Sequence, residues 1–65
     1  MRVVYDRESD TLTIILREDR IRESDEITPG VIADLGYGRQ IVRLEILRAS
    51  QSVDKATEMQ FAVSR

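Results

Sequence analysis

The sequence predicts a mainly β (or α+β) fold: a small antiparallel sheet of four to five strands in two meander-like hairpins, with one short helical turn near residues 49–56. Two runs rich in β-branched residues, Arg2–Tyr5 and Thr11–Leu16, flank a polar turn. A second pair of apolar runs flanks Gly36–Arg39. With 65 residues, the chain is expected to form one domain (1–65) near the lower size limit for independent folding.

The first hairpin is predicted by alternation and by its turn. Leu12, Ile14 and Leu16 recur with a period of two, which is typical of a strand with one buried face. Asp6 suits the first position of a type I turn, where its carboxylate accepts backbone N–H groups. Asp10 tolerates the left-handed conformation better than most residues. Turn geometry is therefore sufficient to explain both acids.

Residues 17–30 are predicted to be a charged connection. The segment is rich in arginines and acids, and Ile21 and Ile27 are its only large apolar residues, so short extended pieces are expected at most around these two. Pro29 and Gly30 then precede a predicted third strand, Val31–Leu35.

The second hairpin turn is predicted at Gly36–Arg39, because two glycines allow positive φ angles close together. The strand that follows alternates most clearly. One face carries Val42, Leu44 and Ile46, and the other carries Arg43 and Glu45.

Beyond Leu47 two interpretations are possible. A strand over residues 57–65 would place Met59, Phe61 and Val63 on one face, whereas a helix would turn Phe61 away from the apolar stripe. We favour the strand for residues 57–65. Serine and aspartate side chains that suit helix N-caps favour the short helical turn before it.

Composition excludes several kinds of chemistry. The chain has no cysteine and no histidine, so thiol nucleophiles, histidine-based serine triads and the common zinc sites are ruled out. Twelve acids against ten bases give a net charge of −2, which disfavours nucleic acid as a partner, and an arginine-based nucleic-acid surface is only the third hypothesis. No apolar run approaches the roughly 20 residues that span a bilayer, and Met1–Asp6 enters the strand pattern directly, so we expect a cytoplasmic protein that does not bind membranes.

Carboxylates are the remaining candidates for a site. The weak candidates for binding a divalent cation are Asp6, Asp10, Asp34 and Glu45. Their spacing does not match a calcium-binding loop, and no catalytic residue and no cofactor is predicted. Glu45 lies in the most apolar strand, so Arg43 or an arginine across the sheet is expected to pair with it. The Tyr5 hydroxyl is expected to reach a nearby carboxylate.

Several short segments occur in a particular order. They are Tyr5-Asp6, Asp10-x-Leu12-x-Ile14-x-Leu16, Ser24-x-Glu26, Gly30-Val31-Ile32-Ala33-Asp34, Gly38 and Glu45-Ile46-Leu47-x-Ala49-Ser50. From about Val3 to Ser50, with a weaker echo in Glu58–Val63, this set resembles the small microbial family called domain of unknown function 2283 (DUF2283). The chain departs from that pattern at Thr13, where an aromatic residue is common, and at Arg43, where glycine is usual.

The resemblance implies a small β-rich domain without an established activity. Relatives are thought to lie beside small toxin-like proteins, which implies an antitoxin-like binding role.

The leading hypothesis is a non-enzymatic protein–protein interaction module that self-associates as a homodimer or larger oligomer. A single-layer sheet has one apolar face and two edges with unpaired backbone groups, and so short a chain has little else to cover them. A small partner protein could add a strand at the same edge. The alternative is a divalent-metal-binding protein or enzyme that uses Asp6, Asp10 and Glu45.

Overall fold

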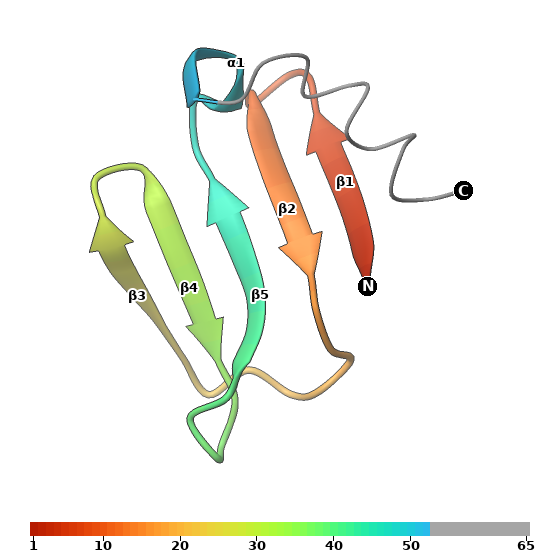
Figure 1. The fold of residues 1–65 in the computed structure, drawn as a ribbon, viewed down its shortest axis with the longest axis vertical. Helices are drawn as coiled ribbons and strands as arrows, with labels where there is room; N and C mark the ends of the chain where they lie inside the picture. Colours follow the sequence, from red (N-terminus) through yellow and green to blue (C-terminus); the bar gives the residue numbers. More distant parts are fainter. Residues whose placement is uncertain (53–65) are drawn as a thin grey trace.

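A computed structural model describes residues 1–52, which form an antiparallel sheet and one short helix (Figure 1). The elements are β1 (Arg2–Asp6), β2 (Thr11–Ile15), β3 (Glu23–Thr28), β4 (Val31–Leu35), β5 (Ile41–Ile46) and α1 (Ala49–Ser52). The predicted fold class is confirmed. No helix in this part of the chain is long and apolar enough to cross a membrane.

The strand order is β1-β2-β5-β4-β3, with every neighbouring pair antiparallel. The chain forms the β1–β2 hairpin, crosses to the far edge, and returns through β3 and β4 so that β5 lies beside β2 (Figure 1). The backbone N–H of Arg22 donates to the carbonyl of Leu35 at 2.7 Å, which holds the end of the crossing segment against β4. The two hairpins are thus joined side by side through their inner strands.

The fifth strand lies where a charged connection was predicted. Residues 23–28 of the predicted 17–30 connection form β3, all of whose residues are exposed. An edge strand with both faces in water has no alternating apolar pattern, which explains why only short extended pieces were expected. The strand predicted over residues 57–65 lies outside the described residues.

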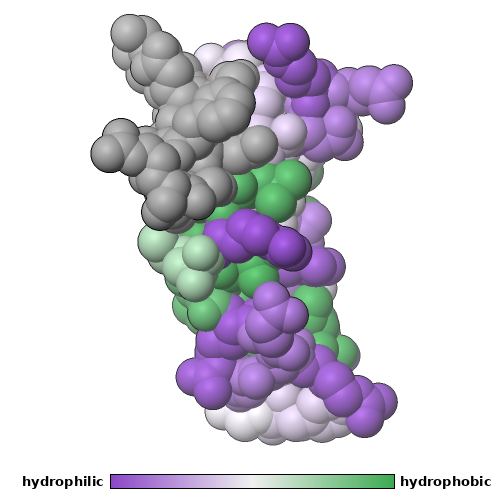
Figure 2. Space-filling view, turned by 90° about the vertical axis from the view of Figure 1, so that its right-hand side faces the viewer, coloured by the Kyte–Doolittle hydropathy of each residue, from purple (hydrophilic) through white to green (hydrophobic). Residues whose placement is uncertain are grey.

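The register places most of the buried apolar side chains on one face of the sheet. Val3, Ile14, Leu44 and Ala33 form one row across β1, β2, β5 and β4. The buried apolar residues are Val3, Leu12, Ala33, Leu35, Val42 and Ala49. Figure 2, seen from the β1 side, shows a band of hydrophobic surface with hydrophilic side chains below it. The opposite face carries the charged residues of β4 and β5.

The first turn forms as predicted. The Asp6 carboxylate accepts hydrogen bonds from the backbone N–H of Glu8 at 3.1 Å and from the Ser9 hydroxyl at 2.8 Å. Asp10 has a φ of 52°, in the left-handed region. Both turn roles of these acids are confirmed.

The second turn forms for a different reason than predicted. Its left-handed residue is Arg39, with a φ of 62°, and not Gly36 or Gly38. A Cβ atom at Gly36 would overlap the side-chain amide of Gln40, and one at Gly38 would lie 2.9 Å from Gln40 Oε1. The two glycines therefore make room for Gln40, and the expectation of positive φ angles at both was wrong.

Candidate functional site: two polar clusters and two sheet edges

The first polar cluster joins the β1–β2 turn to α1, and we call Tyr5, Asp10 and Ser50 the hairpin–helix cluster. Asp10 Oδ1 accepts hydrogen bonds from the Tyr5 hydroxyl at 2.6 Å and from the Ser50 backbone N–H at 3.1 Å. Asp10 Oδ2 accepts the Ser50 hydroxyl at 2.7 Å, and the Asp10 carbonyl accepts the N–H of Ala49 at 2.8 Å. Asp10 thus satisfies N–H groups in the first turn of α1 from a distant part of the chain.

These hydrogen bonds shift the acidity of both partners. The Tyr5 hydroxyl, followed by Ser50, lowers the pKa of Asp10 because each stabilises its ionised form. The same hydrogen bond to Asp10 raises the pKa of Tyr5, because an ionised phenol would lose its donor and face the carboxylate. At neutral pH the cluster holds a carboxylate and a protonated tyrosine.

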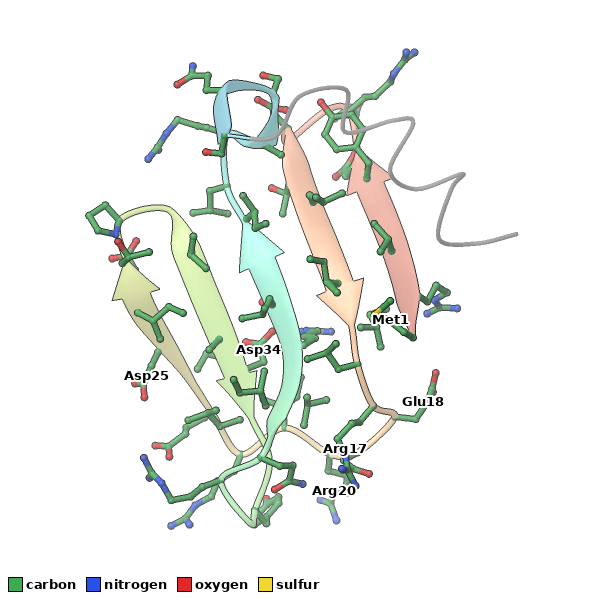
Figure 3. All side chains as sticks on the ribbon, in the orientation of Figure 1. Met1, Arg17, Glu18, Arg20, Asp25 and Asp34 are labelled. Atoms are coloured by element: carbon green, nitrogen blue, oxygen red, sulfur yellow. The ribbon has the colours of Figure 1, made fainter. Side chains whose placement is uncertain are left out.

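The second cluster lies across β3, β4 and β5, and we call Ser24, Asp34, Arg43 and Glu45 the central carboxylate cluster. Ser24 and Arg43 are the register neighbours of Asp34 on either side. Asp34 is only 1% exposed, and Figure 3 shows it in the interior of the sheet, beside β5. The Ser24 hydroxyl donates to Asp34 Oδ1 at 2.5 Å, and Arg43 Nε donates to Oδ2 at 2.6 Å. Glu45 Oε2 lies 3.8 Å from the same Arg43 Nε.

The two carboxyl groups of this cluster have pKa values shifted in opposite directions. Burial opposes ionisation of Asp34, but hydrogen bonds from Glu45, Ser24 and Arg43 outweigh burial and lower its pKa. The hydrogen bond to Asp34, burial and the Asp34 charge together raise the pKa of Glu45. Glu45 therefore retains its proton to a higher pH than an ordinary glutamate.

Because the pKa of Asp34 is lowered and that of Glu45 is raised, the two carboxyl groups change the stability of the fold with pH in opposite directions. The contribution of Asp34, whose pKa is lowered, is present above its unfolded pKa and is lost as the pH falls through its folded pKa. The contribution of Glu45, whose pKa is raised, is complete below its unfolded pKa and is lost as the pH rises through its folded pKa. Deprotonation of Glu45, as the pH rises through its folded pKa, thus costs stability.

The predicted metal candidates are split between separate places. Asp6 and Asp10 lie in the β1–β2 turn, whereas Asp34 and Glu45 lie together on the polar face of β4 and β5. Within residues 1–52, no group of three or more acidic side chains is placed to hold a metal ion. The two hairpins do not bring all four candidates together.

Some contacts were foreseen and others were not. The Tyr5–Asp10 hydrogen bond and the Arg43–Glu45 pairing are confirmed, although Arg43 makes its shorter contact with Asp34. The role of Ser24 was missed. An aspartate in the middle of the apolar run Val31–Leu35 was the available signal, since such a carboxylate needs internal donors.

A shallow groove lies near the ends of β2 and β1. It is lined by Arg2, Ile15, Arg17, Glu18, Asp19, Ile21, Val42 and Arg43. Figure 3 shows Arg17 and Glu18 on the segment that leaves β2. The groove includes Arg43 but neither carboxyl group of the central carboxylate cluster.

The two outer strands are the remaining candidate surfaces, and within the described residues neither has a second strand neighbour. The β1 edge (Arg2–Asp6) has one basic and one acidic end, and Val4 between them is 41% exposed. The β3 edge (Glu23–Thr28) carries three acids and no base, and its pairing with β4 is irregular between Glu26 and Thr28. The edges therefore differ in charge and regularity.

One protein family matches the part of the chain that contains the ordered set of short segments. The model of the family described as "Protein of unknown function (DUF2283)" matches residues 2–50. No curated protein and no solved structure matches the chain. The ordered segments supply all three residues of the hairpin–helix cluster and, except for Arg43, the central carboxylate cluster. Because the match covers most of its length, the chain belongs to the DUF2283 family.

Proposed function

We propose that this protein is a non-enzymatic interaction module that self-associates through the edge of its sheet. The observation that carries the proposal is the single-layer sheet itself, whose outer strands β1 and β3 have one strand neighbour each within residues 1–52. Each such strand presents a row of backbone N–H and C=O groups that another chain can pair with.

The use of the polar clusters supports a non-enzymatic role. Both carboxylate oxygens of Asp10 accept hydrogen bonds from Tyr5 and Ser50, and both oxygens of Asp34 accept them from Ser24 and Arg43. These hydrogen bonds join strands to one another and to the helix. Because both oxygens of each carboxylate already accept internal hydrogen bonds, the two aspartates are poorly placed to act on a substrate.

The size of the chain supports self-association. A domain of about 60 residues buries only about 60% of its unfolded surface, and this chain has no cysteine to form a disulfide. Large apolar side chains are also exposed among the described residues, including Val4 at 41% and Ile27 at 60%. Association that covers an edge stabilises the folded chain by mass action.

The β3 edge supports a more specific, antitoxin-like version of this function. Its acids Glu23, Asp25 and Glu26 would repel a copy of themselves and attract a basic extended segment of another protein. Figure 3 shows Asp25 directed away from β4. Glu23 already contacts Arg39 at 3.3 Å, which shows that arginine fits beside this strand.

Size-exclusion chromatography with light scattering tests self-association. We expect a mass of two or more chains at micromolar concentration, falling towards one chain on dilution. A constant single-chain mass across that range would overturn the proposal.

Titration with a synthetic extended peptide of alternating lysine and valine tests the β3 version. Binding should weaken with added salt and with Asp25→Lys. Failure of the peptide to bind the wild-type chain at low salt would remove this version and leave self-association standing.

A further inference from the structure

We infer that two copies of this chain pair their β1 strands antiparallel about a two-fold axis at Val4, so that one sheet continues through both copies. The inference rests on the proposed function and specifies its partner, a second copy, together with the edge and the register. It follows from the order of residues along β1 and from the charges of β3.

The sequence of β1 is self-complementary in charge. In an antiparallel pair centred on Val4, Arg2 lies opposite Asp6 of the second copy, and Asp6 lies opposite its Arg2. Both residues are exposed, so both can meet a second chain. The two-fold axis repeats this Arg2–Asp6 contact, so each dimer contains two such pairs. Opposite charges directly across a strand pair are favourable.

The same register also matches the two faces of the sheet. Val3 and Tyr5 share the apolar face with Leu12 and Ile14, their neighbours on β2. Pairing about Val4 places Val3 opposite Tyr5 of the second copy, so the apolar face continues across the junction. The two Val4 side chains then meet on the other face, and each covers part of a side chain that is 41% exposed in the single chain.

Neighbouring registers lose these matches. A shift of one residue would place the apolar face of one copy beside the polar face of the other. A shift of two residues would place Val4 opposite Arg2 or Asp6 and would leave both charges without an opposite charge in the partner β1. Only the register centred on Val4 pairs all five residues of β1 and both charges.

The β3 edge lacks this self-complementarity. The face-matched antiparallel registers at its centre place Asp25 opposite Asp25, or Glu26 opposite Glu26, of the second copy. Like charges directly opposite are destabilising, and the irregular pairing between Glu26 and Thr28 further distorts the strand. A β1-to-β3 contact would leave one edge of each type open and would produce a larger ring or an open polymer, whereas pairing of two β1 strands closes as a dimer.

Cysteine cross-linking tests the axis. The chain contains no cysteine, so in a dimer of Val4→Cys the only two thiols, one from each copy, lie opposite each other at the axis. Cβ atoms of opposite residues lie about 4.5–5.5 Å apart, close to the range that a disulfide requires. We expect mild oxidation or a short bismaleimide to convert most of the Val4→Cys protein into covalent dimer. The matched control on the other edge, Asp25→Cys, should remain a single chain on a denaturing gel.

Charge variants test the register independently. Arg2→Glu places a glutamate opposite Asp6 twice in each dimer, and we expect its dissociation constant to rise at least about tenfold. Adding Asp6→Asn, which keeps a side chain suited to the turn, removes that repulsion and should restore most of the affinity.

The outcomes separate the register from the proposed function. A wild-type dimer in which Val4→Cys fails to cross-link and Arg2→Glu has no effect would overturn the Val4 axis and leave self-association standing. A wild-type chain that stays monomeric would overturn both. Cross-linking at Val4 with weakening by Arg2→Glu supports both.

Discussion

Replacing Asp34 by alanine should strongly destabilise this protein. The substitution removes the buried carboxylate at the centre of the central carboxylate cluster. It leaves the Ser24 hydroxyl and Arg43 Nε without the acceptors that now lie at 2.5 and 2.6 Å. Three strands meet at this group, because Ser24 and Arg43 flank Asp34 in the register of β3, β4 and β5.

The expected cost is about 2–3 kcal/mol. The Ser24 hydroxyl bonds an ionised carboxylate, and such a bond contributes roughly 1.5–3 kcal/mol. The Arg43 side chain is 41% exposed and can be rehydrated, so its ion pair is discounted to a surface value of at most about 1 kcal/mol. Total stability for a chain of this length is roughly 3–10 kcal/mol, so the loss is a large fraction of it.

Urea unfolding followed by far-ultraviolet circular dichroism measures this cost. Protein concentration is held fixed because association shifts apparent stability. Asp25→Ala, on the exposed strand β3, is the matched control and should change the free energy of unfolding by less than about 0.5 kcal/mol. If both variants unfold at the same urea concentration, the structural role assigned to Asp34 is wrong.

Three further predictions concern single side chains. At a pH above the raised pKa of Glu45, Glu45→Gln should raise the melting temperature by an amount equivalent to about 0.5 kcal/mol, and at acid pH it should have little effect; a gain that is equal at both pH values would contradict the raised pKa of Glu45. In a Tyr37→Phe background, Asp10→Asn should move the tyrosinate absorbance transition of Tyr5 to lower pH, and an unchanged transition would refute the Asp10 contribution. Leu12→Ala should cost about 2–4 kcal/mol in urea unfolding because Leu12 is 0% exposed, and a loss below about 1 kcal/mol would place the core elsewhere.

Four of the strands could be predicted because their residues alternate or follow turn signals. Leu12 and Ile14, and likewise Val42 and Leu44, alternate with more polar neighbours because one face of the sheet is buried and the other is not. Strand β3 could not be predicted in this way, since all of its residues are exposed and its conformation depends on pairing with β4. Edge strands are determined by a neighbour that the local sequence does not reveal.

The candidate site shows the same division between local and distant contacts. Tyr5 and Asp10 belong to one hairpin, so their hydrogen bond could be expected from the turn alone. The contact between Asp10 and Ser50 joins residues 40 positions apart and requires β5 to lie beside β2, so it does not follow from local patterns. Ser24 and Asp34 lie opposite each other in the β3–β4 hairpin, and their contact was missed because β3 itself was not predicted.

Concentration-dependent amide hydrogen exchange tests whether β1 is the edge through which copies of this chain associate, as we infer. Exchange is compared between a dilute sample and one concentrated enough to associate. We predict that the amides of Arg2–Asp6 become more protected in the concentrated sample, while those of Glu23–Thr28 on the opposite edge do not change. Protection that is independent of concentration at β1, or that rises at β3 instead, would contradict the claim.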